Sequence, residues 1–506
     1  MDKDLASIQE ARDMLRKARE AADQFKNFSQ DQVDRIVQAM AERSLAASKR
    51  LAEMAYEETG YGRVEDKTTK NVFASRNLLE HIKSLRTCGV VHHSENGKII
   101  EIAVPMGIVA ALVPCTNPTS TAIYKSIISL KSRNAIVMSP HPKALNSILE
   151  STRILHDAAC SAGAPRNLVQ CLTLPTLQGS QELMRHELTS VILATGGGPM
   201  VKAAYSAGKP AYGVGPGNVP AYVDRTADVV KAARDIVAGK SFDWGTVCAS
   251  EQSVVADRPI AGKLLEELRK NGTYVCTREE KSALEAVMVD RHGALNPEIV
   301  GQSPEKIAGM AGIKVPRGTR VLLVMLDEVG PKDPLSREKL SPVLGFFIEE
   351  GWKKGCERAI QILNYGGVGH TFAIHCKDQD VIMEFGLHKP AFRIIVNSPA
   401  THGAIGYTTG LPPAMTLGPG TWGGSITTDN IGPLHLVNIK RVAFETNPLD
   451  PADSPSPESR WGYDENFRYR PRDESAATPA PAARSYEKSR MSDADIERIV
   501  KEFKTD

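Results

Sequence analysis

The sequence contains eight cysteines, and the thiol of Cys248 raises the question of nucleophilic chemistry most directly. It lies in the stretch GTVCASE (245–251), between small uncharged residues and with no lysine, arginine or histidine beside it. A cysteine attacks carbonyl carbons through its thiolate, but most free cysteines are small buried hydrophobic residues. The residues around Cys248 therefore leave both roles open.

The other cysteines form no pattern that indicates a metal site. They stand at positions 88, 115, 160, 171, 276, 356 and 376. No two cysteines have CxxC spacing and no HExxH occurs, so we expect neither a structural nor a catalytic metal. In a reducing cytosol these thiols should be free, and we expect them to fill core space.

A glycine-rich turn offers a second candidate for chemistry. An apolar strand runs directly into TGGGP (195–199) and then into a helix, which is where a dinucleotide-binding turn belongs. The full fingerprint GxGxxG needs a third glycine at position 201, where Val201 stands. The alternative that this is only a tight structural turn remains open. If the turn does bind a nucleotide, the missing glycine indicates a variant of the Rossmann fold.

The elements that would position these residues alternate between strands and helices from about residue 100. The predicted strands cover 108–113, 135–138, 191–194 and the region of 211, followed by 253–255, 320–324, 371–374 and 393–396. This alternation is typical of doubly wound parallel sheets. At 506 residues the chain exceeds a single core, so we predict an α/β protein with two such domains. Two amphipathic helices precede them, the second capped by Ser29 with Gln32 three residues on.

The composition excludes some classes of partner. Apolar residues make up 42% of the chain, charged residues 24%, and the net charge is +2. This charge would attract neither nucleic acid nor an anionic membrane. No apolar run is long enough to span a membrane, and the N-terminus lacks a signal-peptide core. We therefore expect a cytoplasmic protein.

Several stretches together resemble the aldehyde dehydrogenase superfamily, and within it the CoA-acylating branch. That branch includes the aldehyde dehydrogenase half of bifunctional alcohol/aldehyde dehydrogenases and the propionaldehyde and acetaldehyde dehydrogenases of bacterial microcompartments. The resemblance covers about residues 5–445. Its main stretches are VPCTNPTSTAIYKSIISLKSRNAIVMSPHP (113–142), ATGGGPMVKAA (194–204), GVGPGNVPAYVD (213–224), GTVCASEQSVV (245–255), REKLSPVLG (337–345), GGVGHT (366–371) and LGPGTWGG (417–424).

The resemblance implies a domain plan for the subunit. A Rossmann-like cofactor domain would span 1–222, with a flap strand near 97–106, and an α/β catalytic domain would span 223–415. An oligomerisation segment would follow at 416–445. Members of the family form dimers or tetramers, so the resemblance implies a homo-oligomer.

The resemblance also implies roles for individual residues. Cys248 falls on the catalytic cysteine, Asn117 on the oxyanion-hole asparagine, and Glu338 on the glutamate that contacts the nicotinamide-side ribose. His370 matches a histidine of the acylating branch and is taken as catalytic, with a role in the core or at the surface left open. The expected cofactor-binding residues are Thr116, Ser139, Pro140, His141, Thr195, Gly196, Gly197 and Gly213, besides Glu338.

An absent carboxylate favours CoA over water as the second substrate. Hydrolytic relatives carry a glutamate that activates water, whereas the matching stretch YGVGPGNVP (212–220) has none. A thiol supplies some thiolate unaided at neutral pH. We therefore expect a short aldehyde such as propionaldehyde or acetaldehyde, CoA and NAD as substrates. A hydrolytic enzyme and a silent scaffold remain as alternatives. No arginine beside SPHP (139–142) would bind a 2′-phosphate, which favours NAD without excluding NADP.

The end of the chain differs from the rest in composition. Residues 446–490 are rich in Pro, Ser, Ala, Asp and Arg and are predicted to form an extended linker. Residues 491–504 predict a short helix, because Ile496, Ile499, Val500 and Phe503 form one apolar stripe. Such a helix is marginal alone and needs a surface. It resembles the encapsulation peptides that direct enzymes into bacterial microcompartments through shell proteins, with docking on its own subunit as the alternative.

Overall fold

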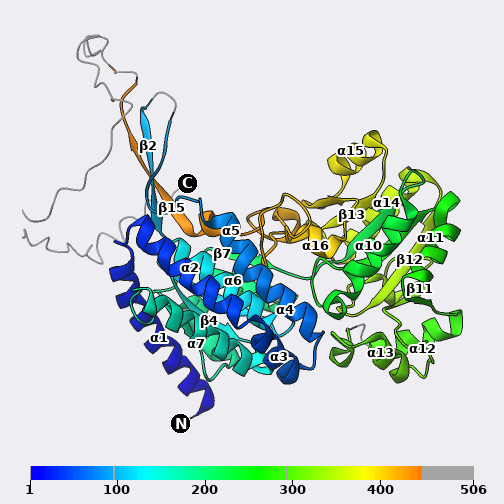
Figure 1. Ribbon diagram of the computed structural model, residues 1–506, viewed down its shortest axis with the longest axis horizontal. Helices are drawn as coiled ribbons and strands as arrows, with labels where there is room; N and C mark the ends of the chain where they lie inside the picture. The colour runs from blue at the N-terminus through cyan, green and yellow to red at the C-terminus, as the bar shows by residue number, and fades with distance from the viewer. Residues whose placement is uncertain (1, 95–96, 291–293, 447–448, 450–506) are drawn as a thin grey trace, which may run out of the picture. The chain divides into compact units, whose positions relative to one another are not determined.

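Two parallel sheets form the framework of the chain, as the alternation of strands and helices predicts (Figure 1). The computed structural model describes residues 2–94, 97–290, 294–446 and 449. Met1–Phe444 form one compact unit. The predicted linker over 446–490, except residues 446 and 449, and the predicted helix over 491–504 lie outside the described residues. The α/β class predicted from the sequence is confirmed.

The first sheet contains five parallel strands in the order β5-β4-β3-β6-β7. Its strands are β3 (Ile108–Val113), β4 (Ala135–Pro140), β5 (Val169–Cys171), β6 (Val191–Thr195) and β7 (Ala211–Val214). Every residue of β3 and β4 is buried. Burial on both faces explains their uninterrupted apolar runs, which are typical of central strands in a parallel sheet.

Helices cover this sheet in two layers. One layer contains α1 (Lys3–Phe25) and α8 (Leu177–Arg185), and the other contains α6 (Pro118–Lys131), α7 (Leu145–Ser161) and α2 (Gln30–Ala46). As predicted, α2 begins at Ser29, whose hydroxyl accepts from the Gln32 amide at 3.3 Å while the Gln32 side chain accepts from the Ser29 amide at 2.8 Å. Helix α4 (Val64–Val72) lies beside α6 and the segment that precedes Cys248.

The second sheet contains seven parallel strands in the order β10-β11-β12-β9-β8-β13-β14. Its strands are β8 (Val219–Val223), β9 (Glu251–Asp257), β10 (Thr273–Val275), β11 (Val321–Met325), β12 (Val343–Glu349), β13 (Phe372–His375) and β14 (Ile394–Val396). Helices α10 (Val229–Ser241) and α11 (Arg258–Lys270) cover one face. The other packs against α12 (Arg278–Met288), α13 (Pro304–Met310), α14 (Gly351–Asn364) and α15 (Gln379–His388).

Four strands of the two sheets are absent from the sequence prediction. Strands β5 and β10 have three residues each and lie at sheet edges, so they carry little periodic signal. Strand β8 contains Pro220, which argues against a central strand, and the register shifts between Val219 and Pro220 to accommodate it. The predicted boundary at 222/223 falls at the end of β8. Strand β12 follows directly on the Ser341-Pro342 turn, and its apolar run was missed.

A third, antiparallel sheet joins residues far apart in the sequence. It contains β1 (Gly89–His93), β2 (Ile99–Pro105) and β15 (Val437–Ala443), and Figure 1 shows β2 and β15 side by side. Their register pairs Ile99 with Ala443 and Pro105 with Val437. The predicted flap strand near 97–106 is β2. Across the described part of the chain, we find no helix with the length and apolar character needed to cross a membrane.

The remaining helices are short connections. A π-helical turn (Phe73–Asn77) continues α4 into α5 (Leu78–Ile82), and α3 (Ser48–Thr59) ends at Gly60, which has φ 67°. Helix α9 (Gly198–Tyr205) follows the glycine-rich turn, and α16 (Ala400–Ala404) follows β14. Since parallel strands end at a common edge, β3, β4, β6 and β7 bring their following loops together there.

Candidate active site

A cavity of about 480 Å³ lies at this edge of the first sheet. Its walls come from the ends of β3, β4, β6 and β7, from the segment 246–248 that precedes β9, and from Glu338 and Leu340. Ten of the residues predicted to form the site line it: Thr116, Asn117, Ser139, Pro140, His141, Thr195, Gly196, Gly197, Cys248 and Glu338. Gly213 and His370 do not. The fold therefore gathers most of the predicted site around one space.

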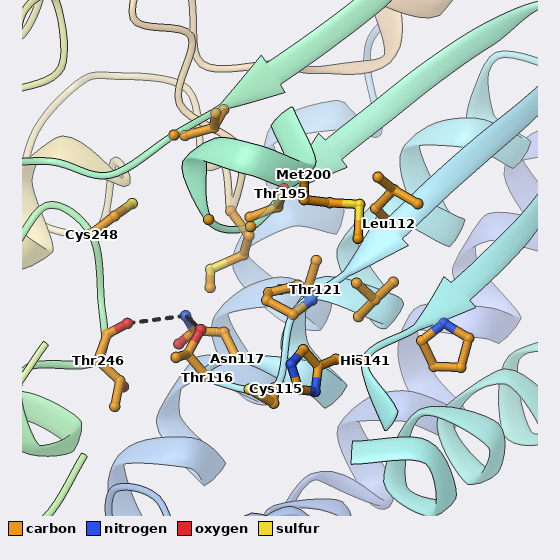
Figure 2. A pocket seen from close by; sticks show the side chains of 18 of the residues that line it. Leu112, Cys115, Thr116, Asn117, Thr121, His141, Thr195, Met200, Thr246 and Cys248 are labelled. Carbon is orange, nitrogen blue, oxygen red and sulfur yellow. Dashed lines mark hydrogen bonds between the residues drawn. The ribbon is translucent and has the colours of Figure 1, made fainter. Parts of the chain in front are cut away.

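The thiol of Cys248 borders this cavity, and the nearby charge that acts to lower its pKa is that of Arg393. Figure 2 shows the Cys248 side chain projecting from the loop into the space that Asn117, Thr195 and Met200 also border. Burial, together with the charge of Glu338, raises the pKa of the Cys248 thiol to about 12. In the ligand-free protein the thiol is therefore protonated at neutral pH.

Asn117 lies opposite the thiol-bearing segment, between β3 and α6. Its side-chain oxygen accepts a hydrogen bond from Lys70 Nζ at 2.6 Å. Its Nδ2 donates to the carbonyl oxygen of Thr246 at 3.3 Å, which Figure 2 marks, and to Thr116 Oγ1 at 3.2 Å. The amide NH₂ is thus directed toward the loop that carries Cys248. Pro118 occupies the first turn of α6, where its missing N–H costs nothing.

Glu338 is the carboxylate among the residues that line the cavity. One of its oxygens accepts from the Gly217 amide at 3.0 Å. Burial raises the pKa of Glu338 to about 7, although the Gly217 bond and nearby Lys240 and Lys339 act against this rise. From the stretch 212–220, Val214, Gly215 and Pro216 line the cavity and bring no carboxylate to it.

The glycine-rich turn between β6 and α9 leaves the cavity wall open. The nearest protein atom to a Cβ added at Gly196 would be 3.8 Å away, and at Gly197 3.9 Å away. Added side chains would thus occupy the cavity itself and not displace protein. The first amides of a helix have no partner within the helix and favour negative groups. The turn therefore has room and free amides for an anionic group, and its role in binding a dinucleotide stays a prediction.

The corner formed by Ser139, Pro140 and His141 carries no charged side chain. Ser139 Oγ lies 2.7 Å from Ser180 Oγ, and Leu177 and Pro175 border the same space. Burial lowers the pKa of His141, and Lys143 lowers it further. Among the described residues that line this cavity there is neither a lysine nor an arginine. This corner is thus apolar; Lys143 does not line it, and its Nζ lies 3.9 Å from the centre of the Tyr61 ring.

Two predicted site residues lie behind the cavity wall. Gly213 is buried in β7, where its amide and carbonyl both bond the Tyr205 hydroxyl, at 3.0 and 2.9 Å. His370 is also buried: its Nδ1 lies 3.0 Å from Thr371 Oγ1, and its Nε2 has no hydrogen-bond partner. Burial, with Arg393 nearby, lowers the pKa of His370 to about 3, so its ring is neutral. The ring also lies close to the segment of Cys248, because a Cβ added at Gly217 would lie 3.2 Å from the His370 ring and 2.3 Å from the Cys248 carbonyl oxygen.

Sequence analysis missed a charged cluster behind Asn117. Lys67 and Lys70 of α4 bind the carboxylate of Asp243, just before the segment of Cys248. Lysines on an amphipathic helix are expected at the surface, so no pattern in the sequence indicates their burial. All eight cysteines lie in the described part of the chain and are free. That part contains no group of three His, Cys, Asp or Glu residues placed to hold a metal.

Comparison with known proteins identifies the family. A family model described as the aldehyde dehydrogenase family matches residues 3–410. An aldehyde-alcohol dehydrogenase of Clostridium acetobutylicum is 41% identical over 444 residues, which cover 87% of this chain and 51% of that protein. The chain thus spans about half the length of the first curated relatives it matches.

The chain matches several solved structures over nearly their whole length. An acetylating aldehyde dehydrogenase from Geobacillus thermoglucosidasius is 48% identical with a TM-score of 0.88, covering 89% of this chain and 99% of that one. A propionaldehyde dehydrogenase from the fucose utilisation bacterial microcompartment of Clostridium phytofermentans is 30% identical (TM-score 0.77; 85% and 96% covered). A propionaldehyde dehydrogenase of Rhodopseudomonas palustris with bound CoA and an acylated cysteine is 27% identical (0.78; 86% and 97%).

The raised pKa of Cys248 predicts how its reactivity depends on pH. Alkylation of Cys248 by iodoacetamide in the ligand-free protein, followed by peptide mass spectrometry, should rise about tenfold per pH unit from pH 7 to 10. A plateau near pH 8.5 would show an ordinary thiol. Glu338→Gln should accelerate alkylation several-fold above pH 7, where the wild-type carboxylate is charged, and have no effect well below pH 7. The exposed Glu350→Gln serves as the control and should change nothing.

Proposed function

Since the chain belongs to the aldehyde dehydrogenase family, we propose that it oxidises short aliphatic aldehydes to acyl-CoA with NAD. The observation that carries this proposal is the juxtaposition of Cys248 and Asn117 on a cavity whose 214–216 wall lacks a carboxylate. The acetylating activity named for one structural neighbour, and the bound CoA and acylated cysteine of another, support it. Propionaldehyde and acetaldehyde are the proposed substrates.

Cys248 is the proposed nucleophile. Its thiolate attacks the aldehyde carbonyl carbon, and a thiohemiacetal with a negative oxygen forms. The Asn117 NH₂ group and the Cys248 backbone amide are the proposed donors to that oxygen, and donors of this kind contribute roughly 10²–10³ in rate. Asn117 Nδ2 donates to Thr116 Oγ1 at 3.2 Å and to the Thr246 carbonyl oxygen at 3.3 Å. One of its two hydrogens would instead be donated to the oxyanion. After oxidation the acyl group is a thioester on Cys248.

The dinucleotide would lie along the ends of the first sheet. When bound, NAD accepts the hydride released from the aldehyde carbon. The open turn at Gly196 and Gly197 would hold its phosphates, and the corner at Ser139–His141 its adenine. Glu338 is proposed to accept hydroxyl hydrogens of the nicotinamide-side ribose. The absence of a cation among the described lining residues favours NAD, and NADP is not excluded.

The second half-reaction favours a thiol over water. A water molecule needs a base close to the thioester, and the wall at Val214, Gly215 and Pro216 supplies none. CoA brings a thiol with a pKa near 8.5, which is partly ionised at neutral pH. Its thiolate attacks the thioester carbonyl and the Cys248 thiolate leaves. Because a thioester is exchanged for a thioester, the step is nearly balanced in energy and reversible.

The quaternary structure and location are also proposals. In the antiparallel sheet of β1, β2 and β15, Ile99 is 39% exposed and Val442 is 40% exposed. We propose that this sheet joins the subunits of a homo-oligomer. The microcompartment origin of one structural neighbour supports a compartment lumen as the site of action. The predicted helix at 491–504 would then dock on a shell protein.

An NADH assay tests the central proposal. The protein with propionaldehyde and NAD⁺ should produce sustained NADH only when CoA is added, because only CoA clears the thioester rapidly. Cys248→Ala should abolish aldehyde oxidation and acyl-CoA reduction while its melting temperature stays near that of the wild type. Sustained turnover without CoA would support hydrolysis, and a well-folded Cys248→Ala variant with substantial activity would exclude Cys248 as the nucleophile.

Introducing a carboxylate tests the argument from the missing base. Val214→Glu should raise the ratio of free acid to acyl-CoA, because residue 214 lines the cavity. Val214→Gln is the control of similar size without a base. Gly213→Glu is unsuitable, since a Cβ there would lie 2.7 Å from Tyr205 and Val201. If the wild-type protein already releases acid as fast as CoA captures the acyl group, the argument fails.

Removing the terminal helix tests the location. A fluorescently labelled full-length chain should co-localise with shell proteins, and deletion of 485–506 should disperse it with little change in activity. Ile499→Asp should also disperse it, because it places a charge in the apolar stripe. Lys501→Ala, on the opposite side of the helix, should not. A large loss of activity or stability on deletion would favour docking on its own subunit.

A further inference from the structure

A buried carboxylate binds two lysines behind the wall that carries Asn117. Asp243 is fully buried, and the side chains of Lys67 and Lys70 are each 2% exposed. The two lysines stand one turn apart on α4, so both point to the same side of the helix. Lys67 Nζ lies 3.1 Å from Asp243 Oδ2, and Lys70 Nζ contacts the same oxygen. Such burial of charge is costly unless each group is bound.

The backbone around Asp243 is held in an uncommon conformation by this cluster. Asp243 has φ 47° and Trp244 φ 49°, in the left-handed region that residues other than glycine seldom adopt. The Asp243 amide donates to Asp66 Oδ2 at 2.7 Å, and Asp243 Oδ1 accepts from the Arg63 amide at 2.7 Å. Burial alone would raise the pKa of Asp243, but Lys67 and Lys70 lower it below its ordinary value.

Both sides of the candidate active site are tied to this cluster. Lys70 Nζ donates to Asn117 Oδ1 at 2.6 Å, and Lys67 Nζ donates to the Thr116 carbonyl at 3.2 Å. Asp243 Oδ2 also accepts from Thr246 Oγ1 at 2.7 Å, two residues before Cys248. One carboxylate therefore connects the proposed oxyanion donor with the segment that carries the proposed nucleophile.

Lys70 determines which way the Asn117 amide faces. A lysine ammonium only donates, so the atom of Asn117 that meets it has to be the oxygen. A flipped amide would bring its NH₂ against the ammonium and lose the 2.6 Å bond. In the observed orientation the NH₂ faces Thr246 O and the loop of Cys248. The positive charge of the Lys70 ammonium, next to the amide oxygen, also polarises the amide and strengthens its N–H as a donor.

We propose that Lys70, anchored on Asp243, is a positioning residue that orients and polarises Asn117 as the oxyanion donor for reactions at Cys248. This inference rests on the proposed function, since it requires acyl chemistry at Cys248. Lys70 itself touches neither the thiol nor the substrate in this arrangement. Lys67 shares the helix, the burial and the carboxylate with Lys70, but it contacts a backbone carbonyl in place of the Asn117 side chain, which makes it a matched control.

Two reactions of the Cys248 thiol distinguish a positioning role of Lys70 from a general structural role. p-Nitrophenyl acetate acylates Cys248 by attack on a carbonyl, with p-nitrophenolate leaving, and so passes through an oxyanion. Iodoacetamide alkylates Cys248 by displacement of iodide and forms no oxyanion. In Lys70→Met, acylation should be roughly 10- to 100-fold slower, while alkylation stays within about threefold of the wild type. In Lys67→Met, acylation should stay within about threefold of the wild type. A parallel loss of both reactions in Lys70→Met, or an equal loss of acylation in Lys67→Met, would overturn the inference.

The double variant Lys70→Met/Asn117→Ala gives the sharpest outcome. Because Lys70 is proposed to act through Asn117, the double variant should be acylated no more slowly than Asn117→Ala alone. Losses that multiply would show an independent role for Lys70 and overturn the inference. Lys70→Arg, which keeps the buried charge if Lys70→Met does not fold, should lose acylation roughly three- to tenfold with alkylation unchanged; a wild-type acylation rate there would contradict the inference.

The wild-type result separates the two proposals. Wild-type acylation at Cys248 with an equally fast Lys70→Met variant would refute the positioning role and leave the proposed function standing. A wild-type protein in which the ester does not acylate Cys248 would refute the nucleophile, and the inference with it. Neither reaction needs CoA or NAD, so failure of the NADH assay alone would not decide the role of Lys70.

Discussion

The buried carboxylate of Asp243 is the constraint around which the active-site region is arranged. It binds two lysines of α4, the Thr246 hydroxyl and the Arg63 amide, and so joins an N-terminal helix to the segment before β9. Removing one partner from a buried ion pair typically costs about 3–5 kcal/mol, because the remaining charge is left uncompensated. The cluster is thus able to hold the left-handed backbone at Asp243 and Trp244, which would otherwise relax.

The two lysines of the Asp243 cluster do not border the cavity that holds the thiol. Lys67 and Lys70 neutralise Asp243, whereas the cavity wall around Cys248 is mostly uncharged apart from Glu338. Burial raises the pKa of Cys248 most, Glu338 raises it further, and Arg393 acts against this rise. A buried thiol of raised pKa reacts slowly at neutral pH, so a ligand that changes its surroundings would change its reactivity.

The same wall supports the proposed preference for CoA over water. The chain crosses from the first sheet to the second between β7 and β8, and this crossing passes the cavity as Val214, Gly215 and Pro216. A glutamate in this crossing would stand where a base is needed, and none is present. Gly217 instead donates its amide to Glu338, which links the crossing to the segment before β12 and occupies one oxygen of the cavity's carboxylate.

The sequence by itself determined the α/β class, most of the central strands, the Ser29 cap and ten residues of the cavity wall, because apolar runs, glycine turns and family motifs are local signals. It could not reveal strand β8, whose Pro220 is tolerated only through a register shift. Nor could it place Gly213 and His370 behind the wall, since burial depends on the packing of distant segments. Only the tertiary structure decided that Lys67 and Lys70 are interior residues. A lysine on an amphipathic helix is expected in solvent, and Lys70 is buried only because the fold brings against it the carboxylate of Asp243, 173 residues away along the chain.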